Sequence, residues 1–302
     1  MDALEQRIAA QFSREVHPAV LGFATKLAGE EPRALAVLFY GSNLRTGSLE
    51  GVLDYYVLTD GEQQEKIWPR VSYHEAVIEG EAAKEQVRAK VATMSLAQFR
   101  KAASGASRDT TIWARFVQPC GLIWERDADA GNAVLSAVAE AAKTAARLAA
   151  ALGPESGTAA DYWRALFQAT YKAEFRVEKP GREDSILSVN AAHFDGLLPV
   201  AWEADGLEFA ADGDTLKPQI SAKARRETLR WWAKRQRLGK PLNIARLLKA
   251  STTFEGAGRY AAWKITRHTG VPIEVTPWRE KHPVLSAPAV LWQVWRGNKR
   301  QG

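Results

Sequence analysis

Residues 40–60 read YGSNLRTGSLEGVLDYYVLTD, and this stretch decides the predicted fold. The run that leads into it, Ala34–Tyr40 (ALAVLFY), is short, continuous and apolar, which is typical of a buried strand. Val52–Thr59 (VLDYYVLT) is a second strand pattern, and Asp60-Gly61 ends it. The sequence therefore predicts two strands joined by a loop that begins at Gly41-Ser42.

A Gly-Ser pair at the end of a strand, followed by an Asp inside the next strand, is the pattern of polymerase-β-like nucleotidyltransferases. Glycine lets backbone amides approach a triphosphate, the Ser42 hydroxyl adds a donor, and the second strand points the Asp54 carboxylate at Mg²⁺. Taken alone the pattern is weak, because a Tyr-Gly-Ser loop between two strands is also ordinary hairpin chemistry. The usual Asp-x-Asp pair is here Asp54-Tyr55-Tyr56. A second metal-binding carboxylate must then come from elsewhere in the chain.

The remaining sequence predicts further strands and many helices, and so an α/β (α+β) fold. Val71–Ile78 and Gln86–Ser95 are strand candidates, and helical spacing recurs after them. We expect a nucleotidyltransferase domain with a mixed sheet in residues 1–130, a mainly helical domain in 131–215, and a basic, tryptophan-rich region in 216–302. Helices are expected at 4–29 with an interruption at Pro18, and at 96–103, 132–152, 158–170, 221–237 and 242–249.

The segment LDYYVLTD (53–60) resembles the mitochondrial-type phosphatidate cytidylyltransferases, which have a lone Asp in a Leu-Asp-aromatic strand that ends in a further Asp. Residues 71–95 are similar to the next two strands of that family and place Lys90 where the family has a lysine. TIWARFVQP (111–119) resembles its arginine-before-proline segment, which is the position of Arg115. Residues 152–194 match its Pro-Glu-Ser helix start, its Tyr-x-x-acid-Phe-Arg turn and its Asn-x-x-His-Phe ending.

The resemblance implies that CTP and phosphatidate react to give CDP-diacylglycerol and pyrophosphate, with Mg²⁺ as cofactor. Arg176 is the candidate for the lipid phosphate, although an arginine in this turn also suits an ion pair with Glu174. For Lys90 and Arg115, an exposed basic side chain on a strand is the structural alternative. The implied catalytic residues are Asp54, Ser42 and Lys90; the implied nucleotide-binding residues are Tyr40, Gly41, Ser42, Lys90 and Arg115; the implied metal ligands are Asp54, Asp60 and Glu75.

Charge is distributed unevenly along the chain, whose overall net charge is +6. From Lys217 to Gly302 there are 19 Lys and Arg against 4 Asp and Glu, a net charge of +15, so the first 216 residues carry −9. Tryptophans alternate with these basic residues, for example at Trp231-Trp232 and at Trp263. This composition predicts an anionic partner, either a membrane surface or single-stranded nucleic acid, and we favour the membrane. Tryptophans packed in a helical core and a solvated basic face are the structural alternatives.

Several classes of protein are excluded by composition. The single cysteine, Cys120, cannot form an internal disulfide, and no run of about 18 apolar residues predicts a membrane span. Asp2 and Glu5 make the first residues an amphipathic helix rather than a targeting segment. We therefore expect a cytoplasmic protein that lies peripherally on the inner face of the membrane. Transfer onto another acceptor, such as a sphingolipid phosphate, and a non-catalytic nucleic-acid-binding protein with the same fold remain the alternatives.

Overall fold

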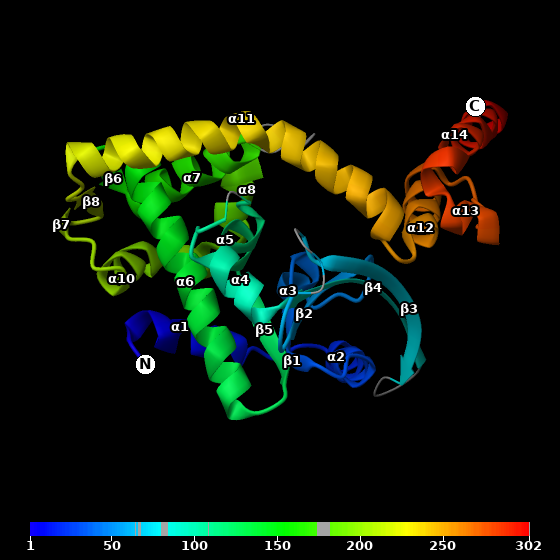
Figure 1. Ribbon diagram of the computed structural model, residues 1–302, viewed down its shortest axis with the longest axis horizontal. Helices are drawn as coiled ribbons and strands as arrows, with labels where there is room; N and C mark the ends of the chain where they lie inside the picture. Colours follow the sequence, from blue (N-terminus) through cyan, green and yellow to red (C-terminus); the bar gives the residue numbers. More distant parts are fainter. Residues whose placement is uncertain (64, 66–67, 80–83, 108, 174–181, 302) are drawn as a thin grey trace.

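The computed structural model describes residues 1–301 except 64, 66–67, 80–83, 108 and 174–181, and its centre is a five-stranded mixed sheet (Figure 1). The strand order is β3-β4-β2-β1-β5, in which β2 and β4 are parallel and the other neighbours are antiparallel. A mixed sheet with helices on both faces confirms the predicted fold class. The strands are β1 (Ala34–Tyr40), β2 (Leu53–Thr59), β3 (Arg70–Glu79), β4 (Lys84–Ser95) and β5 (Cys120–Glu125).

One face of the sheet is covered by α2 (Pro18–Glu30), which begins at the proline where the sequence predicts an interruption. Odd-numbered strand residues such as Phe39, Tyr55 and Val91 point to this face and pack against Phe23 of α2. Because side chains alternate along a strand, the even-numbered residues point to the opposite face. That opposite face carries the candidate site residues discussed below.

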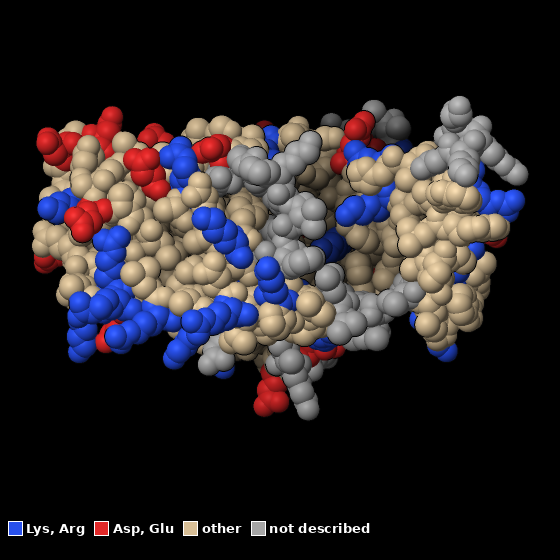
Figure 2. All heavy atoms as spheres, turned by 90° about the horizontal axis from the view of Figure 1, so that it is seen from above, with Lys and Arg blue, Asp and Glu red and all other residues tan. Residues whose placement is uncertain are grey.

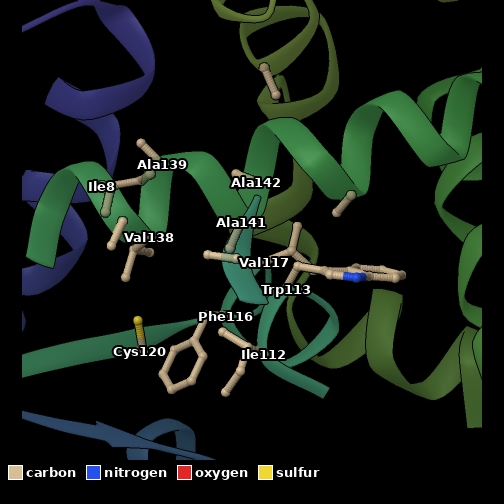
Figure 3. Close-up of a cluster of buried hydrophobic side chains, with 14 of the residues drawn as sticks. Ile8, Ile112, Trp113, Phe116, Val117, Cys120, Val138, Ala139, Ala141 and Ala142 are labelled. Carbon is tan, nitrogen blue, oxygen red and sulfur yellow. The ribbon is translucent and has the colours of Figure 1, made fainter. Parts of the chain in front are cut away.

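Helices α1 (Ala3–Phe12), α4 (Leu96–Ala103), α5 (Thr111–Phe116) and α6 (Ala128–Leu152) cover the second face. Figure 3 shows how α6 packs there, with Val138 and Ala141 against Ile112 and Phe116 of α5. The small side chains of the alanine-rich α6 let several helices approach it closely. The buried cluster is continuous from Leu4 to Trp232, so the expected boundary after residue 130 does not divide two separate cores.

The middle of the chain adds helices and a small second sheet. Strands β6 (Gly157–Thr158), β8 (Thr215–Pro218) and β7 (Phe209–Asp212) form it in that order, in a region expected to be mainly helical. Tyr162 connects the helices to this sheet, because its hydroxyl donates to the carbonyl of Leu216 at 2.9 Å. The helices are α7 (Ala159–Ala173), α8 (Arg182–Val189), α9 (Ala191–Phe194) and α10 (Leu197–Ala204).

Helix α11 (Ala222–Thr253) runs along one side of the protein and links α6 and α7 to the C-terminal helices (Figure 1). The sequence predicts two helices here, yet α11 continues through Pro241. Tertiary contacts on either side of the proline explain the continuity: Arg235 donates to Thr110, and Arg246 pairs with Asp109. The C-terminal helices are α12 (Ala257–Thr269), α13 (Pro277–Lys281) and α14 (Pro283–Gln301). Within the described residues, every helix is too short or too polar to span a bilayer.

Candidate active site

Three neighbouring strands bring Tyr40, Asp54 and Lys90 into one row across the sheet. Tyr40 ends β1 and is paired with Asp54 on β2, which is in turn paired with Lys90 on β4. Side chains directly opposite one another on paired strands share a face. The even-numbered neighbours Tyr56 and Ala92 belong to the core under α4, α5 and α6, which identifies this face. Three of the expected site residues therefore lie side by side.

Gly41 turns the chain out of β1 and into the short helix α3 (Ser42–Thr46). Its φ of 94° and ψ of −163° lie in a region that is essentially limited to glycine. A Cβ at this position would also lie 3.1 Å from Oδ2 of Asp54. Glycine is thus required both by the backbone and by the carboxylate that it faces.

The loop after Gly41 is closed by Asn43, which the sequence pattern did not single out. Asn43 is buried, and its Nδ2 donates hydrogen bonds to the carbonyls of Ser48 at 2.7 Å and Glu50 at 2.8 Å. Ser42 is exposed, and its hydroxyl lies 3.4 Å from Oδ1 of Asn43. Asn43 therefore fixes the loop, while the Ser42 hydroxyl remains accessible to a ligand.

The Asp54 carboxylate has no direct protein partner within the described part of the chain: no described residue donates a hydrogen bond to it or pairs with it within 4.0 Å. The Lys90 ammonium likewise has no hydrogen bond or ion pair with a described residue. Partly buried charged groups normally have partners, so two such groups on adjacent strands indicate a ligand site.

Electrostatic effects on these groups follow from their burial and from Arg115. Burial raises the pKa of Asp54, while Lys90 and Arg115 oppose the rise. Burial lowers the pKa of Lys90, Arg115 lowers it further, and Asp54 opposes this effect. The side chains thus place charge in a poorly solvated site, where it interacts strongly with a charged ligand.

Arg115 lies on α5, and its guanidinium is 5.1 Å from the centre of the Tyr40 ring. Burial raises the pKa of Tyr40 to about 12, with Arg115 lowering it and Asp54 raising it. Tyr40 is consequently a neutral phenol at physiological pH. Arg115 therefore does not lie on a strand, which was the structural alternative; helix α5 brings it to the end of β1, beside Tyr40, Asp54 and Lys90.

Asp60, an expected metal ligand, does not join Asp54. The two residues lie at opposite ends of β2, and six residues of a strand span about 20 Å. The Asp60 side chain is 65% exposed and forms an ion pair with Arg126 at 3.6 Å. The expectation that Asp60 completes the site at Asp54 is therefore wrong, because strand length separates the two carboxylates.

Glu75, the other expected ligand, lies on β3, two strands from Asp54. Its Oε1 accepts a hydrogen bond from the Tyr73 hydroxyl at 2.8 Å and lies 3.7 Å from Nε of Arg88. It lines a separate hollow beneath α12. Glu75 thus interacts with Tyr73 and Arg88, and it does not line the hollow that contains Asp54.

The donor set restricts how Mg²⁺ can bind. Among the described residues there is no group of three or more Asp, Glu, His or Cys side chains that could hold a metal ion. Mg²⁺ is commonly held by one or two carboxylates together with water and substrate phosphates. Asp54 can therefore bind a Mg²⁺ ion that is also bound by the phosphates of a nucleotide, but the described residues do not supply a complete set of protein ligands.

Of the residues matched by the resemblance at 171–194, Arg176, Glu174 and Phe175 lie outside the described residues. His193 is structural: its Nε2 donates to the carbonyl of Val117 at 2.8 Å, and its ring packs against Phe194. Burial lowers the pKa of His193 to about 4. It is therefore neutral at physiological pH and holds α9 against the end of α5.

Three hollows meet at Tyr40 and Arg115, which line all of them. We call them the Asp54 hollow, which also contains Lys90; the Gly41 hollow, which reaches Thr170 and Tyr171 of α7; and the apolar hollow, which reaches Met94 and Trp68. Lys90 also lines the apolar hollow. A ligand at Asp54 can therefore extend toward α7 or into the apolar hollow.

The C-terminal region contributes to this site, which local sequence patterns did not predict. Helix α12 supplies one side of the Asp54 hollow with Tyr260, Trp263, Lys264, Arg267 and His268. For Trp263 and the basic residues beside it, the sequence predicts only a membrane or nucleic-acid surface. A truncation near residue 240, which would be expected to leave the catalytic domain complete, removes this side of the hollow.

Asp109 and Arg246 form a second feature that sequence patterns missed. Burial alone would raise the pKa of Asp109, but Arg246 and hydrogen bonds from Thr111 and Trp68 hold the pKa below its usual value. Arg246 lies 3.1 Å from the Asp109 carboxylate, and Lys249 pairs with Glu65 at 2.6 Å. These pairs fix the second half of α11 beside the apolar hollow.

No family model matches the chain, and no curated protein matches it in sequence. Among solved structures, the chain is similar to a nucleotidyltransferase-like protein from Exiguobacterium sibiricum 255-15, with 12% identity over 82% of this chain and 79% of that chain. The TM-score of this comparison is 0.23. A likeness at this level supports no conclusion about chemistry, so function has to be inferred from the residues of the site.

Proposed function

We propose that the protein is a nucleotidyltransferase that transfers the CMP group of CTP to phosphatidate. The observation that carries the proposal is the Asp54 carboxylate, which has no partner among the described residues, faces Gly41 and lies in one row with Tyr40 and Lys90. Phosphoryl and nucleotidyl transfer depend mainly on positioning and on neutralising charge. The choice of CTP and phosphatidate rests on the resemblance of the sequence.

The chain's own residues bind and orient the two substrates. Ser42 donates its hydroxyl to a nucleotide phosphate beside the Gly41 turn. Lys90 and Arg115 neutralise the charge that develops on phosphate oxygens, and this effect is stronger than in open solvent because both cations are partly buried. Tyr40 stays neutral and keeps the Arg115 guanidinium over its ring.

The bond changes are those of a single displacement. An oxygen of the acceptor phosphate attacks the α-phosphorus of CTP, and the bond from that phosphorus to the oxygen bridging the α- and β-phosphates breaks. Pyrophosphate leaves with the electron pair. A phosphomonoester is largely ionised at pH 7, because its second pKa is about 6, so no strong general base is needed.

Asp54 is the residue that would hold Mg²⁺, together with phosphate oxygens of the nucleotide. When bound, the ion supplies Lewis-acid neutralisation of phosphate charge. Asp54 has to be ionised for this role, and the neighbouring Lys90 and Arg115 favour the ionised form. No other carboxylate in the described part of the chain lines the Asp54 hollow.

The apolar hollow supports an acceptor that combines a phosphate with an apolar part. Lys90 and Arg115 line it together with apolar side chains such as Met94 and Ile112. A lipid phosphate has this combination of groups, whereas a sugar phosphate does not. Because a sphingolipid phosphate shares the same chemistry, phosphatidate and sphingolipid phosphates are the two acceptors to compare.

Peripheral attachment to the inner, cytoplasmic face of an anionic membrane would bring this site to its insoluble substrate. Trp292, Leu291 and Leu285 on α14 are 57%, 66% and 68% exposed, and a 3.6-residue period puts them on one side of that helix. Arg296 lies 4.3 Å from the centre of the Trp292 ring. Exposed aromatic and basic groups together suit the interface of an anionic bilayer.

The test is turnover by the purified full-length protein. Radiolabelled CTP, ATP, GTP and UTP are each supplied with Mg²⁺ and a panel of lipid phosphates in detergent micelles. We expect a labelled nucleotide-lipid product with CTP and an equal amount of pyrophosphate. Absence of turnover with every combination, together with tight binding of single-stranded nucleic acid, would favour the non-catalytic alternative that the basic C-terminal region suggests.

A further inference from the structure

Helix α12 presents two cations to the Asp54 hollow, a cavity of about 490 Å³. Lys264 and Arg267 are three residues apart, so they lie on neighbouring positions of one helix face. Both residues are exposed. Helix α12 belongs to the C-terminal helices, whereas Tyr40 on β1 and Arg115 on α5 belong to the body of the protein (Figure 1), and Figure 2 shows basic side chains on both of these parts.

The position of α12 is fixed by contacts with the edge strand β3. The Tyr73 backbone N–H donates to the carbonyl of Glu255 at 2.8 Å, immediately before α12 begins. The ring of Tyr260 lies 5.5 Å from that of Tyr73 and is stacked on Trp263 at 6.4 Å. Arg267 in turn lies 5.4 Å from the centre of the Trp263 ring. A continuous aromatic stack thus holds the two cations relative to the sheet.

Arg267 reaches the loop that follows the Gly41-Ser42 turn. A Cβ on Gly51 would lie 3.1 Å from Nη1 of Arg267, and Gly51 has a φ of 93°. The loop between α3 and β2 is therefore in contact with α12, although more than 200 residues separate them in the sequence. The guanidinium therefore lies beside Gly51, near the end of the loop that begins with the Gly41-Ser42 turn.

Lys264 and Arg267 differ from neighbouring basic residues because no described carboxylate pairs with them. Arg259, on the same helix, pairs with Glu280 at 3.5 Å, and Arg246 pairs with Asp109. Among the described residues that line the Asp54 hollow, Asp54 is the only carboxylate, and Lys90, Lys264 and Arg267 are cations that no described carboxylate pairs with. These three side chains exceed the charge of Asp54 by two, which suits a polyanionic ligand.

We propose that Lys264 and Arg267 are phosphate-binding residues of the site at Asp54, so that the C-terminal region forms part of the catalytic site. The inference rests on the proposed function. The shared chemistry is that of a phosphate group, which comes either from the triphosphate of the nucleotide or from the acceptor. Bidentate donation by arginine and a mobile lysine ammonium are both suited to phosphate oxygens.

The test compares two double variants of the full-length protein. Lys264→Ala/Arg267→Gln removes the proposed pair, and Lys223→Ala/Arg226→Gln removes an exposed Lys and Arg at the same spacing on α11, away from the hollow. Both lose the same charge. Equilibrium binding of CTP and of inorganic pyrophosphate is measured with Mg²⁺, and the KM for a short-chain, micelle-free lipid phosphate is measured at saturating CTP.

We expect the α12 variant to lose at least about tenfold in one of these quantities, while the α11 variant stays near wild type. Weaker binding of CTP and pyrophosphate assigns the pair to the triphosphate, and a raised acceptor KM with unchanged CTP binding assigns it to the acceptor phosphate. Equal effects of both double variants, or no effect of either, would overturn the proposal. Binding of pyrophosphate requires no turnover, so this result stays separate from a failure to detect transfer.

Discussion

The backbone of Gly41 lies against the carboxylate of Asp54: a Cβ on Gly41 would be 3.1 Å from Oδ2. This contact joins the turn after β1 to Asp54, a carboxylate that has no partner among the residues that the structure describes. The side of the glycine that faces Asp54 is therefore where a phosphate and a carboxylate-bound ion would meet. The variants below separate this chemistry from the ordinary needs of the fold.

Gly41→Ala should impair transfer more than its cost in stability explains. The φ of 94° strains any other residue, which costs about 1–3 kcal/mol, and the added methyl group crowds Asp54. Gly47→Ala is the matched control, because Gly47 has a φ of 66° and nothing lies within 4 Å of its Cβ position. We expect both variants to lower the free energy of unfolding and only Gly41→Ala to lower kcat by tenfold or more. Equal kcat values for Gly41→Ala and Gly47→Ala would show that the contact between Gly41 and Asp54 does not matter for transfer.

Ser42→Ala should raise the KM for CTP and leave stability unchanged. The hydroxyl is exposed and lies only near Oδ1 of Asn43, at 3.4 Å, so the fold does not depend on it. Loss of one hydrogen bond to a charged phosphate costs about 1.5–3 kcal/mol, which is tenfold or more in apparent affinity. Initial rates measured over a range of CTP concentrations test this, and an unchanged KM would indicate that the Gly41-Ser42 turn is only a turn.

Asn43→Ala, in contrast to Ser42→Ala, should mainly lower the stability of the protein. It leaves the carbonyls of Ser48 and Glu50 without their donor and opens the loop next to Ser42. We expect a loss of about 1–3 kcal/mol in the free energy of unfolding, measured by urea denaturation. Wild-type stability in this variant would show that the loop is held by other contacts.

The stability of the protein should fall as the pH is lowered from about 6.5 to 4, with a contribution from His193. Its pKa is about 4 in the folded state, because burial disfavours the charged ring. The unfolded chain binds this proton at a pKa of about 6.5, so the unfolded state gains protons first, and stability present above pH 6.5 is lost as the pH falls. His193→Gln should lack this part of the dependence, which amounts to about 3 kcal/mol. If the free energy of unfolding of wild type and of His193→Gln changed with pH in the same way, His193 would not contribute to the pH dependence.

Attachment to vesicles of anionic lipid should decrease with ionic strength, because the Debye length falls from about 10 Å at 0.1 M to about 3 Å at 1 M salt. Release should be partial, since the apolar contacts of α14 are not screened. Leu291→Ala/Trp292→Ala should weaken attachment at both salt concentrations, whereas Leu21→Ala/Leu229→Ala, which alters exposed apolar residues on other helices, should not. Sedimentation with vesicles measures this, and equal attachment of both double variants would locate the membrane contact outside α14.

Local patterns in the sequence were sufficient to predict the central strands of the fold. The apolar run of β1, the Leu-Asp-aromatic run of β2 and the glycine between them predicted the strands that carry Tyr40 and Asp54. Lys90 came from the resemblance, and the parallel pairing of β2 with β4 places it beside Asp54. Because side chains alternate between the two faces along a strand, Tyr40, Asp54 and Lys90 then lie on the same face of the sheet.

Contacts between distant parts of the chain could not be predicted in this way. The pair of Asp109 and Arg246 is separated by 137 residues, and neither residue stands in a recognisable motif. The same holds for α12, whose Trp263, Lys264 and Arg267 have the composition of a membrane surface but line the Asp54 hollow. Asp60 is a different case, because six residues of strand already imply its distance from Asp54.

The most direct test of the account is Asp54→Asn in the full-length protein, measured for both transfer and stability. Burial raises the pKa of Asp54, which means that the folded protein disfavours the charge that catalysis needs. The uncharged variant should therefore unfold at the same or a higher urea concentration than wild type, while formation of labelled CDP-diacylglycerol from CTP and phosphatidate falls by about 100-fold or more. Near-normal transfer by Asp54→Asn, or loss of transfer only in step with loss of folding, would contradict the assignment of Asp54 as the catalytic carboxylate.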